Sequence, residues 1–309
     1  MDLQHTLQEK RERVNKELKK YFEKKRKDLM EVDGAVAKEN YDIMQDYILG
    51  GGKRLRAICA LMGYEACGGK SPDKMILPSL SVEFFHNSSL ILDDVMDEDK
   101  ERRDVKAAHT LIGEWFGKKF GKQPYNGYLF ANAESRFSIS MSTIATNMLF
   151  SLGAQTILDS SFDAKEKTKA LHAYEKTYRM VNLGQLLDMY YEYEKKITSK
   201  DYLKMAYLKT GVLLGCALKI GGIFAGAGEK QLEAFDEYAK YAATTFQIQD
   251  DILDVTPGSE KGRELGSDLK KGKTTLLLLL AKENLESTDW KILEKVLGNE
   301  NAETRDMEK

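Results

Sequence analysis

The sequence predicts an all-α protein, a bundle of helices that forms a single domain. Three observations support this fold class. Leu, Ala, Glu and Lys are abundant and the chain has only 4 prolines, so residues that favour helices dominate. Apolar residues recur at helical spacing through long segments. No segment combines the alternation of apolar and polar residues with turn dipeptides at strand spacing.

The first third of the chain predicts helices at about 1–31, 35–49, 55–67 and 74–98. The first of these is charged and amphipathic. Glycine clusters such as Gly50-Gly51-Gly52 separate the others, because glycine readily ends a helix in the left-handed conformation.

Residues 117–137 mix glycine, proline, asparagine, lysine and aromatic residues without a period, which predicts an irregular insertion. Helical patterns then resume at about 138–159, 164–195, 199–226 and 229–255. A Gly- and Lys-rich loop at 257–273 and two shorter helices follow. We therefore expect one helical domain over residues 1–309, interrupted by this insertion.

Composition excludes several classes of protein. The chain carries 47 basic and 49 acidic residues, a net charge of −2, which gives no indication of a nucleic-acid partner. Its three cysteines are too few and too scattered for a disulfide framework or a zinc site. The N-terminus lacks the apolar core of a signal peptide, and no run of about 18 uncharged apolar residues occurs. We expect a cytoplasmic protein without a membrane span.

Two acidic motifs of the form D-D-x-x-D each lie at the end of an apolar helix. The first begins at Asp93 in SLILDDVMD and ends at Asp97, and the second begins at Asp250 in FQIQDDILD and ends at Asp254. A spacing of four residues places the first and last carboxylate on one face of the helix. A single acidic cluster is usually a solvated face, but two clusters on apolar helices repel unless a cation lies between the carboxylates. Facing each other across a bundle, they would hold magnesium and leave room for a phosphate.

Basic residues fit the same site. Lys53, Arg54 and Arg56 follow the glycine cluster at a helix start, where free N–H groups and the helix dipole also favour an anion. Arg102 and Arg103 follow the first acidic motif. Lys209 interrupts an apolar helix, and three further lysines follow the second motif, Lys270, Lys271 and Lys273. Each of these alone is more typical of a surface charge. Together they indicate a site for two polyanions.

These motifs carry a family resemblance. Between about residues 40 and 285, the chain contains the motifs GGKRLR, EFFHNSSLILDDVMDEDKERR, GQLLD, KT, FQIQDDILD and LGSDLKKGKTT. In these motifs and in their spacing, the sequence resembles the trans-isoprenyl diphosphate synthase (polyprenyl synthetase) family, in particular geranylgeranyl diphosphate synthases. The resemblance implies an orthogonal helical bundle around a central cavity, the isoprenoid synthase fold, and a homodimer. It also implies a magnesium-dependent prenyltransferase that joins isopentenyl diphosphate to an allylic diphosphate and releases pyrophosphate.

The resemblance assigns roles to individual residues. The isopentenyl diphosphate site would comprise Lys53, Arg56, His86 and Arg103. Up to three magnesium ions, bound with the substrate diphosphate, would be held by Asp93, Asp97 and Asp250, supported by Asp94, Asp251 and Asp254. The allylic diphosphate would contact Arg102, Lys209, Thr210, Gln247 and Lys273, with Gln185 and Asp188 near the reacting centre. The residues expected to act in catalysis are Asp93, Asp94, Asp97, Arg102, Lys209 and Asp250.

Product length should depend on the depth of the apolar cavity below Asp93. Ser88 and Ser89 lie one helical turn below it, where short-chain members of the family carry an aromatic floor, so the passage is expected to stay open there. One turn further, Phe84 and Phe85 are the candidates for the floor, with ordinary core aromatics as the alternative. We expect geranylgeranyl diphosphate or a longer polyprenyl diphosphate as the product.

Some positions depart from the family pattern. Asp104 replaces a glycine, the segment DVKAAH keeps only His109 of the usual motif, and Thr146-Asn147 replaces a glycine-aspartate pair. The sequence leaves two alternative functions, a non-catalytic or regulatory subunit of a heteromeric synthase and a class I terpene cyclase. All six motif aspartates are present, which argues against a subunit that has lost its ligands, whereas GGKRLR and His86 argue against a cyclase.

Overall fold

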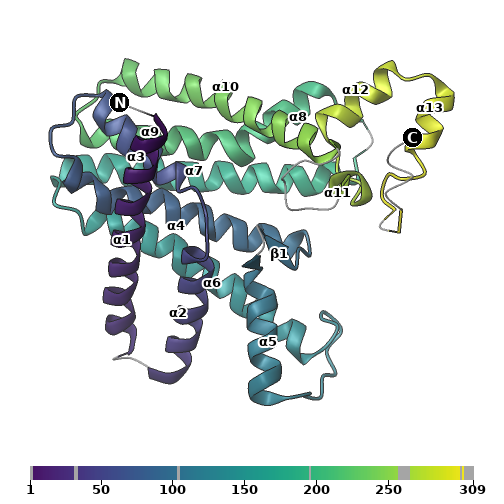
Figure 1. The fold of residues 1–309 in the computed structure, drawn as a ribbon, viewed down its shortest axis with the longest axis horizontal. Helices are drawn as coiled ribbons and strands as arrows, with labels where there is room; N and C mark the ends of the chain where they lie inside the picture. The colour runs from purple at the N-terminus through teal and green to yellow at the C-terminus, as the bar shows by residue number, and fades with distance from the viewer. Residues whose placement is uncertain are drawn as a thin grey trace. The chain divides into compact units, whose positions relative to one another are not determined.

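The computed structural model describes residues 3–30, 34–102, 105–194, 196–256, 265–299 and 301–302, and these residues are almost entirely helical (Figure 1). The helices of the N-terminal half are α1 (Leu3–Met30), α2 (Gly34–Leu49), α3 (Leu55–Ala66), α4 (Pro72–Met96), α5 (Ala108–Phe120) and α6 (Ala133–Leu158). Those that follow are α7 (Ala164–Tyr191), α8 (Ser199–Ala206), the π-helical turn η1 (Tyr207–Gly211), α9 (Val212–Phe224), α10 (Glu229–Asp254), α11 (Ser267–Lys270), α12 (Leu276–Asn284) and α13 (Ser287–Leu293). A hairpin of two-residue strands, β1 (Glu101–Arg102) and β2 (Val105–Lys106), joins α4 to α5.

The chain packs as two compact units. Unit 1 comprises Met1–Tyr174 and Cys216–Leu232, and unit 2 comprises Glu175–Gly215 and Glu233–Lys309. The boundaries lie within α7, α9 and α10. The expectation of one domain over residues 1–309 stays a prediction, and each unit is described here by itself.

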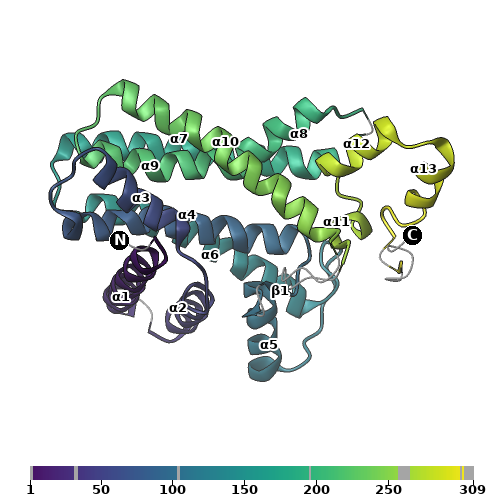
Figure 2. The ribbon, with the colours of Figure 1, turned by 45° about the horizontal axis from the view of Figure 1, so that its top comes forward.

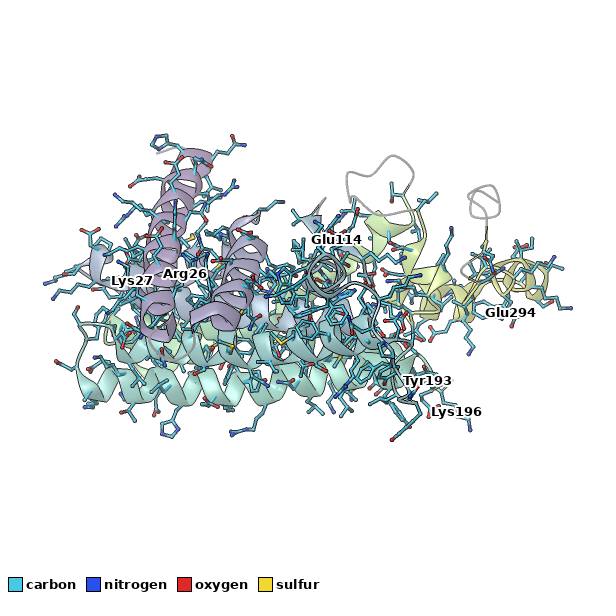
Figure 3. All side chains as sticks on the ribbon, turned by 90° about the horizontal axis from the view of Figure 1, so that it is seen from below. Arg26, Lys27, Glu114, Tyr193, Lys196 and Glu294 are labelled. Atoms are coloured by element: carbon cyan, nitrogen blue, oxygen red, sulfur yellow. The ribbon has the colours of Figure 1, made fainter. Side chains whose placement is uncertain are left out.

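Helix α4 is the centre of unit 1. It packs against α1, α3, α5 and α6, and most of its middle is buried, including Leu80, Phe84 and Phe85. A helix that is apolar on every side is stable only when other helices cover it. Figures 1 and 2 show α1 and α2 side by side. Arg26 of α1 pairs with Asp42 of α2 at 3.0 Å between Nη2 and Oδ1, which links the two helices near the end of α1 (Figure 3).

Unit 2 contains a close approach between α7 and the π-helical turn η1. A Cβ atom on Gly184 of α7 would lie 2.3 Å from the backbone nitrogen of Lys209, so only glycine fits at this crossing. A small core of Tyr202, Met205, Ala206 and Leu279 packs α8 against α12. The extra residue in a π-helical turn frequently occurs at functional sites, and here the turn contains Lys209 and Thr210.

The predicted helices agree with the structure to within a few residues, apart from the region around the insertion. Residues 117–120 and 133–137, expected to be irregular, are helical, and the segment between α5 and α6 spans only 121–132. The helix α5 was not predicted. Its aromatic residues Trp115, Phe116 and Phe120 pack against Phe137 of α6, with ring centroids 5.0 to 6.4 Å apart. Asn132 caps α6 by accepting a hydrogen bond from Ser135 N at 2.7 Å.

One stretch among the described residues, Ser199–Phe224, is long and apolar enough to cross a membrane on composition alone. It comprises α8, η1 and α9. Because 72% of its most apolar window is buried inside the protein, it has the character of a core helix.

Candidate functional site

The first acidic motif lies at the C-terminal end of α4, in unit 1. The backbone N–H of Asp97 donates to the carbonyl of Asp93 at 2.8 Å, so helical geometry continues through the motif. Asp93 and Asp97 therefore share one face, as the spacing predicts. Asp94 is fully buried, whereas Asp93 and Asp97 are only half-buried.

Arg102 of β1 binds the first two carboxylates of this motif. Its Nη2 donates to Asp93 Oδ2 at 2.8 Å, and its Nε donates to Asp94 Oδ1. Burial alone would lower the pKa of Arg102, but Asp94 and Asp93 outweigh that effect and the pKa is raised. The β1–β2 hairpin thus places a fixed positive charge beside the motif, whereas the expected contact of Arg102 with the allylic diphosphate stays a prediction.

Asp94 has a second partner that the sequence did not indicate. Tyr47 of α2 donates its hydroxyl to Asp94 Oδ2 at 2.8 Å. Burial raises the pKa of Tyr47, and the nearby Asp94 raises it further, so the tyrosine is a stable donor. Burial also raises the pKa of Asp94, but the guanidinium and the hydroxyl both favour its ionised form. The middle carboxylate is therefore anchored from two sides.

The GGKRLR segment separates its three cations. Arg54 is buried and bonded inside the protein, whereas Lys53 is exposed and Arg56 half-buried at the start of α3. Lys53 and Arg56 are the two predicted contacts of a diphosphate. His86, the third predicted contact in unit 1, is half-buried on α4. Arg103 lies outside the described residues.

The four candidate chain-length residues lie below Asp93 on α4. Ser88 is buried and Ser89 half-buried, and each hydroxyl donates to a backbone carbonyl of its own helix, at 2.7 and 2.8 Å. Phe84 and Phe85 are both fully buried but point to different neighbours. Phe84 packs on Tyr21 and Phe22 of α1, whereas Phe85 packs on Phe150 and Tyr174 of α6 and α7. The two rings therefore do not act as one surface.

The second acidic motif ends α10, in unit 2. Asp250 is half-buried, and Asp251 and Asp254 are buried. Asp251 accepts the hydroxyl of Tyr202 from α8 and the amide of Gln247 at 3.1 Å. Burial raises the pKa of Asp251 despite these two bonds.

Asp254 faces the start of α11. It accepts the hydroxyl of Ser267 at 2.9 Å and the backbone N–H of Asp268 at 3.1 Å. Hydrogen bonds thus hold Asp251 and Asp254 within unit 2, and Asp250 is the most exposed of the three.

The GQLLD and KT segments meet within unit 2. Lys209 Nζ donates to Asp188 Oδ2 at 2.6 Å, and Thr210 donates to Gln247 Oε1 at 3.4 Å. One turn before Asp188 on α7, the amide nitrogen of Gln185 is buried and has no hydrogen-bond partner among the described residues. Lys273 is half-buried in the loop after α11. Of the predicted allylic diphosphate contacts, Thr210 and Gln247 therefore bond to each other, whereas Lys209 bonds to Asp188.

Magnesium fits the donors of the first motif. Asp93 and Asp97 offer carboxylate oxygens one helical turn apart, which are hard ligands. Within the described part of the chain, no three side chains of Asp, Glu, His or Cys converge as a closed metal cage. Magnesium takes one or two carboxylates and completes its shell with substrate phosphates and water, so an incomplete protein cage suits it.

Comparison with known proteins identifies the family and the fold. The family model described as polyprenyl synthetase matches residues 37–309. A short chain isoprenyl diphosphate synthase of Methanocaldococcus jannaschii is 30% identical over 96% of this chain and 79% of its own length. A geranylgeranyl pyrophosphate synthase of Geoglobus acetivorans is 30% identical over 87% of this chain and 76% of its own length. The solved structure of geranylgeranyl pyrophosphate synthetase from Pyrococcus horikoshii covers 97% of this chain and 83% of its own, at 27% identity and a TM-score of 0.76. The predicted all-α fold is confirmed.

Proposed function

The chain belongs to the polyprenyl synthetase family, whose members are prenyltransferases, and we propose that it condenses isopentenyl diphosphate with an allylic diphosphate. The reaction releases pyrophosphate and forms geranylgeranyl diphosphate or a longer polyprenyl diphosphate. The observation that carries the proposal is the complete acidic motif at the end of the buried helix α4, where Arg102 donates hydrogen bonds to Asp93 and Asp94.

The chemistry requires that the bond between the allylic carbon and its diphosphate ionises, and charge then develops on the departing pyrophosphate. In this proposal, Arg102 and Lys209 stabilise that charge without acting as nucleophiles. Magnesium would be held by Asp93 and Asp97 of the first motif and by Asp250 of the second, and would supply further positive charge. Lys53, Arg56 and His86, with Arg103, hold isopentenyl diphosphate so that its double bond attacks the allylic cation.

We also propose that the protein acts as a cytoplasmic homodimer, as the family resemblance implies. Size-exclusion chromatography with light scattering would give its mass in solution, and a mass near that of one chain would overturn the dimer.

The direct test incubates the purified protein with magnesium, labelled isopentenyl diphosphate and either geranyl or farnesyl diphosphate. Chromatography of the dephosphorylated products then gives their length. A geranylgeranyl alcohol or a ladder of longer alcohols is expected. Absence of incorporation with every primer would overturn the proposed reaction.

Phe85 is proposed as the floor that limits the product. The Phe85→Ala variant should then form longer products, because it opens the apolar space between α4, α6 and α7. Phe84→Ala is the matched control, since Phe84 packs toward α1 instead. Identical product lengths in wild type and Phe85→Ala would remove Phe85 from this role.

A further inference from the structure

Arg54 adopts an unusual backbone conformation for its position. It is the residue before the first turn of α3, with φ 55° and ψ 28°, in the left-handed region. Among the described residues, only Arg54 and Glu98 are non-glycine residues with positive φ. Residues at this point of a helix normally have extended backbone and a side chain that caps the helix, and Arg54 makes no such cap. The strain must be offset by other contacts.

Three hydrogen bonds hold the Arg54 side chain, each from a different element. Nε donates to Asn15 Oδ1 of α1 at 2.7 Å, Nη1 donates to Glu83 Oε1 of α4 at 3.1 Å, and Nη2 donates to the carbonyl of Ile48 in α2 at 2.6 Å. The side chains of Arg54 and Glu83 are only 3% and 4% exposed. A buried guanidinium that donates hydrogen bonds in three directions has little freedom to rotate.

The buried Arg54 side chain determines the direction of the neighbouring Lys53 and Arg56 side chains. Because the backbone turns at Arg54, its side chain points into the protein while Lys53 stays exposed and Arg56 half-buried. The outward pair comprises the proposed ligands of isopentenyl diphosphate. If Arg54 relaxed to an extended conformation, the direction of both side chains would change with it.

Helix α1 is firmly fixed where it contributes Asn15. Val14, Leu18 and Phe22 form a fully buried stripe along it. Lys10 pairs with Glu65 of α3 and Arg13 pairs with Asp73 of α4, and both lie shortly before Asn15 in α1. The family model begins to match at residue 37, so α1 lies before the part of the chain that defines the family.

We propose that Asn15 of α1 is a positioning residue for the isopentenyl diphosphate site, acting through Arg54 to keep Lys53 and Arg56 directed outward. The proposal rests on the proposed function, because it assumes that these two cations bind isopentenyl diphosphate. It makes α1 part of the site through Arg54, although no residue of α1 is among the proposed ligands of the substrate.

The test is the Asn15→Ala variant, which removes one of the three bonds and leaves the buried ion pair of Arg54 and Glu83 in place. The KM for isopentenyl diphosphate should rise about threefold to tenfold, less than the full value of a bond to a charged group because the effect is indirect. The KM for farnesyl diphosphate and kcat should change less than about twofold. Asn15→Asp keeps an oxygen acceptor for Nε and should restore the KM.

Lys16→Ala is the matched control, an exposed neighbour of Asn15 on α1, and should behave as wild type. Calorimetric titration with isopentenyl diphosphate alone, without magnesium, should show the same loss of affinity in Asn15→Ala. An unchanged KM in Asn15→Ala would overturn the proposal, as would an equal rise for both substrates accompanied by a lower melting temperature. Wild-type protein that incorporates no isopentenyl diphosphate in the same assay would instead overturn the proposed function.

Discussion

The acidic motif on α4 and the acidic motif on α10 share the pattern D-D-x-x-D but neutralise their charge with different partners. In the first, Arg102 binds both Asp93 and Asp94. In the second, the hydrogen-bond donors to Asp251 among the described residues are neutral, a hydroxyl from Tyr202 and an amide from Gln247. A full positive charge thus lies beside Asp94 in the first motif, whereas the neutral dipoles of a hydroxyl and an amide stabilise Asp251 in the second.

The two motifs also share a feature. In each, the middle aspartate is buried and accepts the hydroxyl of a tyrosine from another helix, Tyr47 for Asp94 and Tyr202 for Asp251. In both motifs the first aspartate, Asp93 or Asp250, is more exposed than the middle aspartate that the tyrosine holds.

The largest expected effect comes from removing the positive charge of the first motif. Arg102→Gln leaves Asp94 buried without its cation, and breaking a buried ion pair costs about 3 to 5 kcal/mol of stability. It also removes a charge that stabilises the leaving group, so kcat should fall by about 100-fold to 1,000-fold. Urea unfolding and steady-state kinetics measure the two effects.

Arg102→Lys is the matched control for this variant. It keeps the charge but loses the planar fork that reaches both carboxylates, so its stability and kcat should lie between those of wild type and Arg102→Gln. Equal stability in all three proteins would mean that the pair contributes nothing to the fold.

The sequence predicted most of the helices, but it did not predict which residues hold the candidate ligands in place. Most helices follow directly from apolar periodicity, because a buried face repeats at a fixed spacing. Helix α5 was missed because its second half, with Gly117, Lys118 and Lys119, has the composition of a loop. Contacts with Phe137 of α6, which local propensity does not encode, stabilise it.

Tyr47 and Tyr202 could not be found for a related reason. They lie 47 and 49 residues from their aspartates, so only the packing of helices brings each pair together. The buried role of Arg54 was also hidden. In GGKRLR it is one of three adjacent cations, and only the left-handed turn separates it from Lys53 and Arg56.

The tyrosine anchors give the second-largest expected effect. Among the described residues, Tyr202→Phe leaves Asp251 with Gln247 as its hydrogen-bond donor, so the free energy of unfolding should fall by about 1 to 3 kcal/mol, the cost of a poorly satisfied buried group. Tyr47→Phe should cost less, because Arg102 still binds Asp94. Urea unfolding at neutral pH checks the order. A larger loss in Tyr47→Phe would show that the tyrosine, and not the guanidinium, is the main anchor of the first motif.

The smallest effect should depend on pH and comes from the buried carboxyl group of Asp251. Because burial raises the pKa of Asp251 in the folded chain, the folded state binds more protons than the unfolded state between the ordinary carboxyl pKa of 3.8 and the raised value. The free energy of unfolding therefore falls as pH rises through this window, and the loss persists above it.

Asp251→Asn removes the cost of a buried negative charge and keeps an oxygen acceptor, so the variant should be more stable than wild type at pH 7. The gain should be smaller than the loss of about 1 to 3 kcal/mol expected for Tyr202→Phe. Below the window both proteins are neutral at this position, and the difference should disappear. Asp94→Asn should gain nothing at pH 7, because it removes a partner that Arg102 needs. Melting temperatures of the three proteins from acid to neutral pH measure the contrast. If both asparagine variants are stabilised, the guanidinium does not favour the ionised form of Asp94, and the two motifs differ less than their partners suggest.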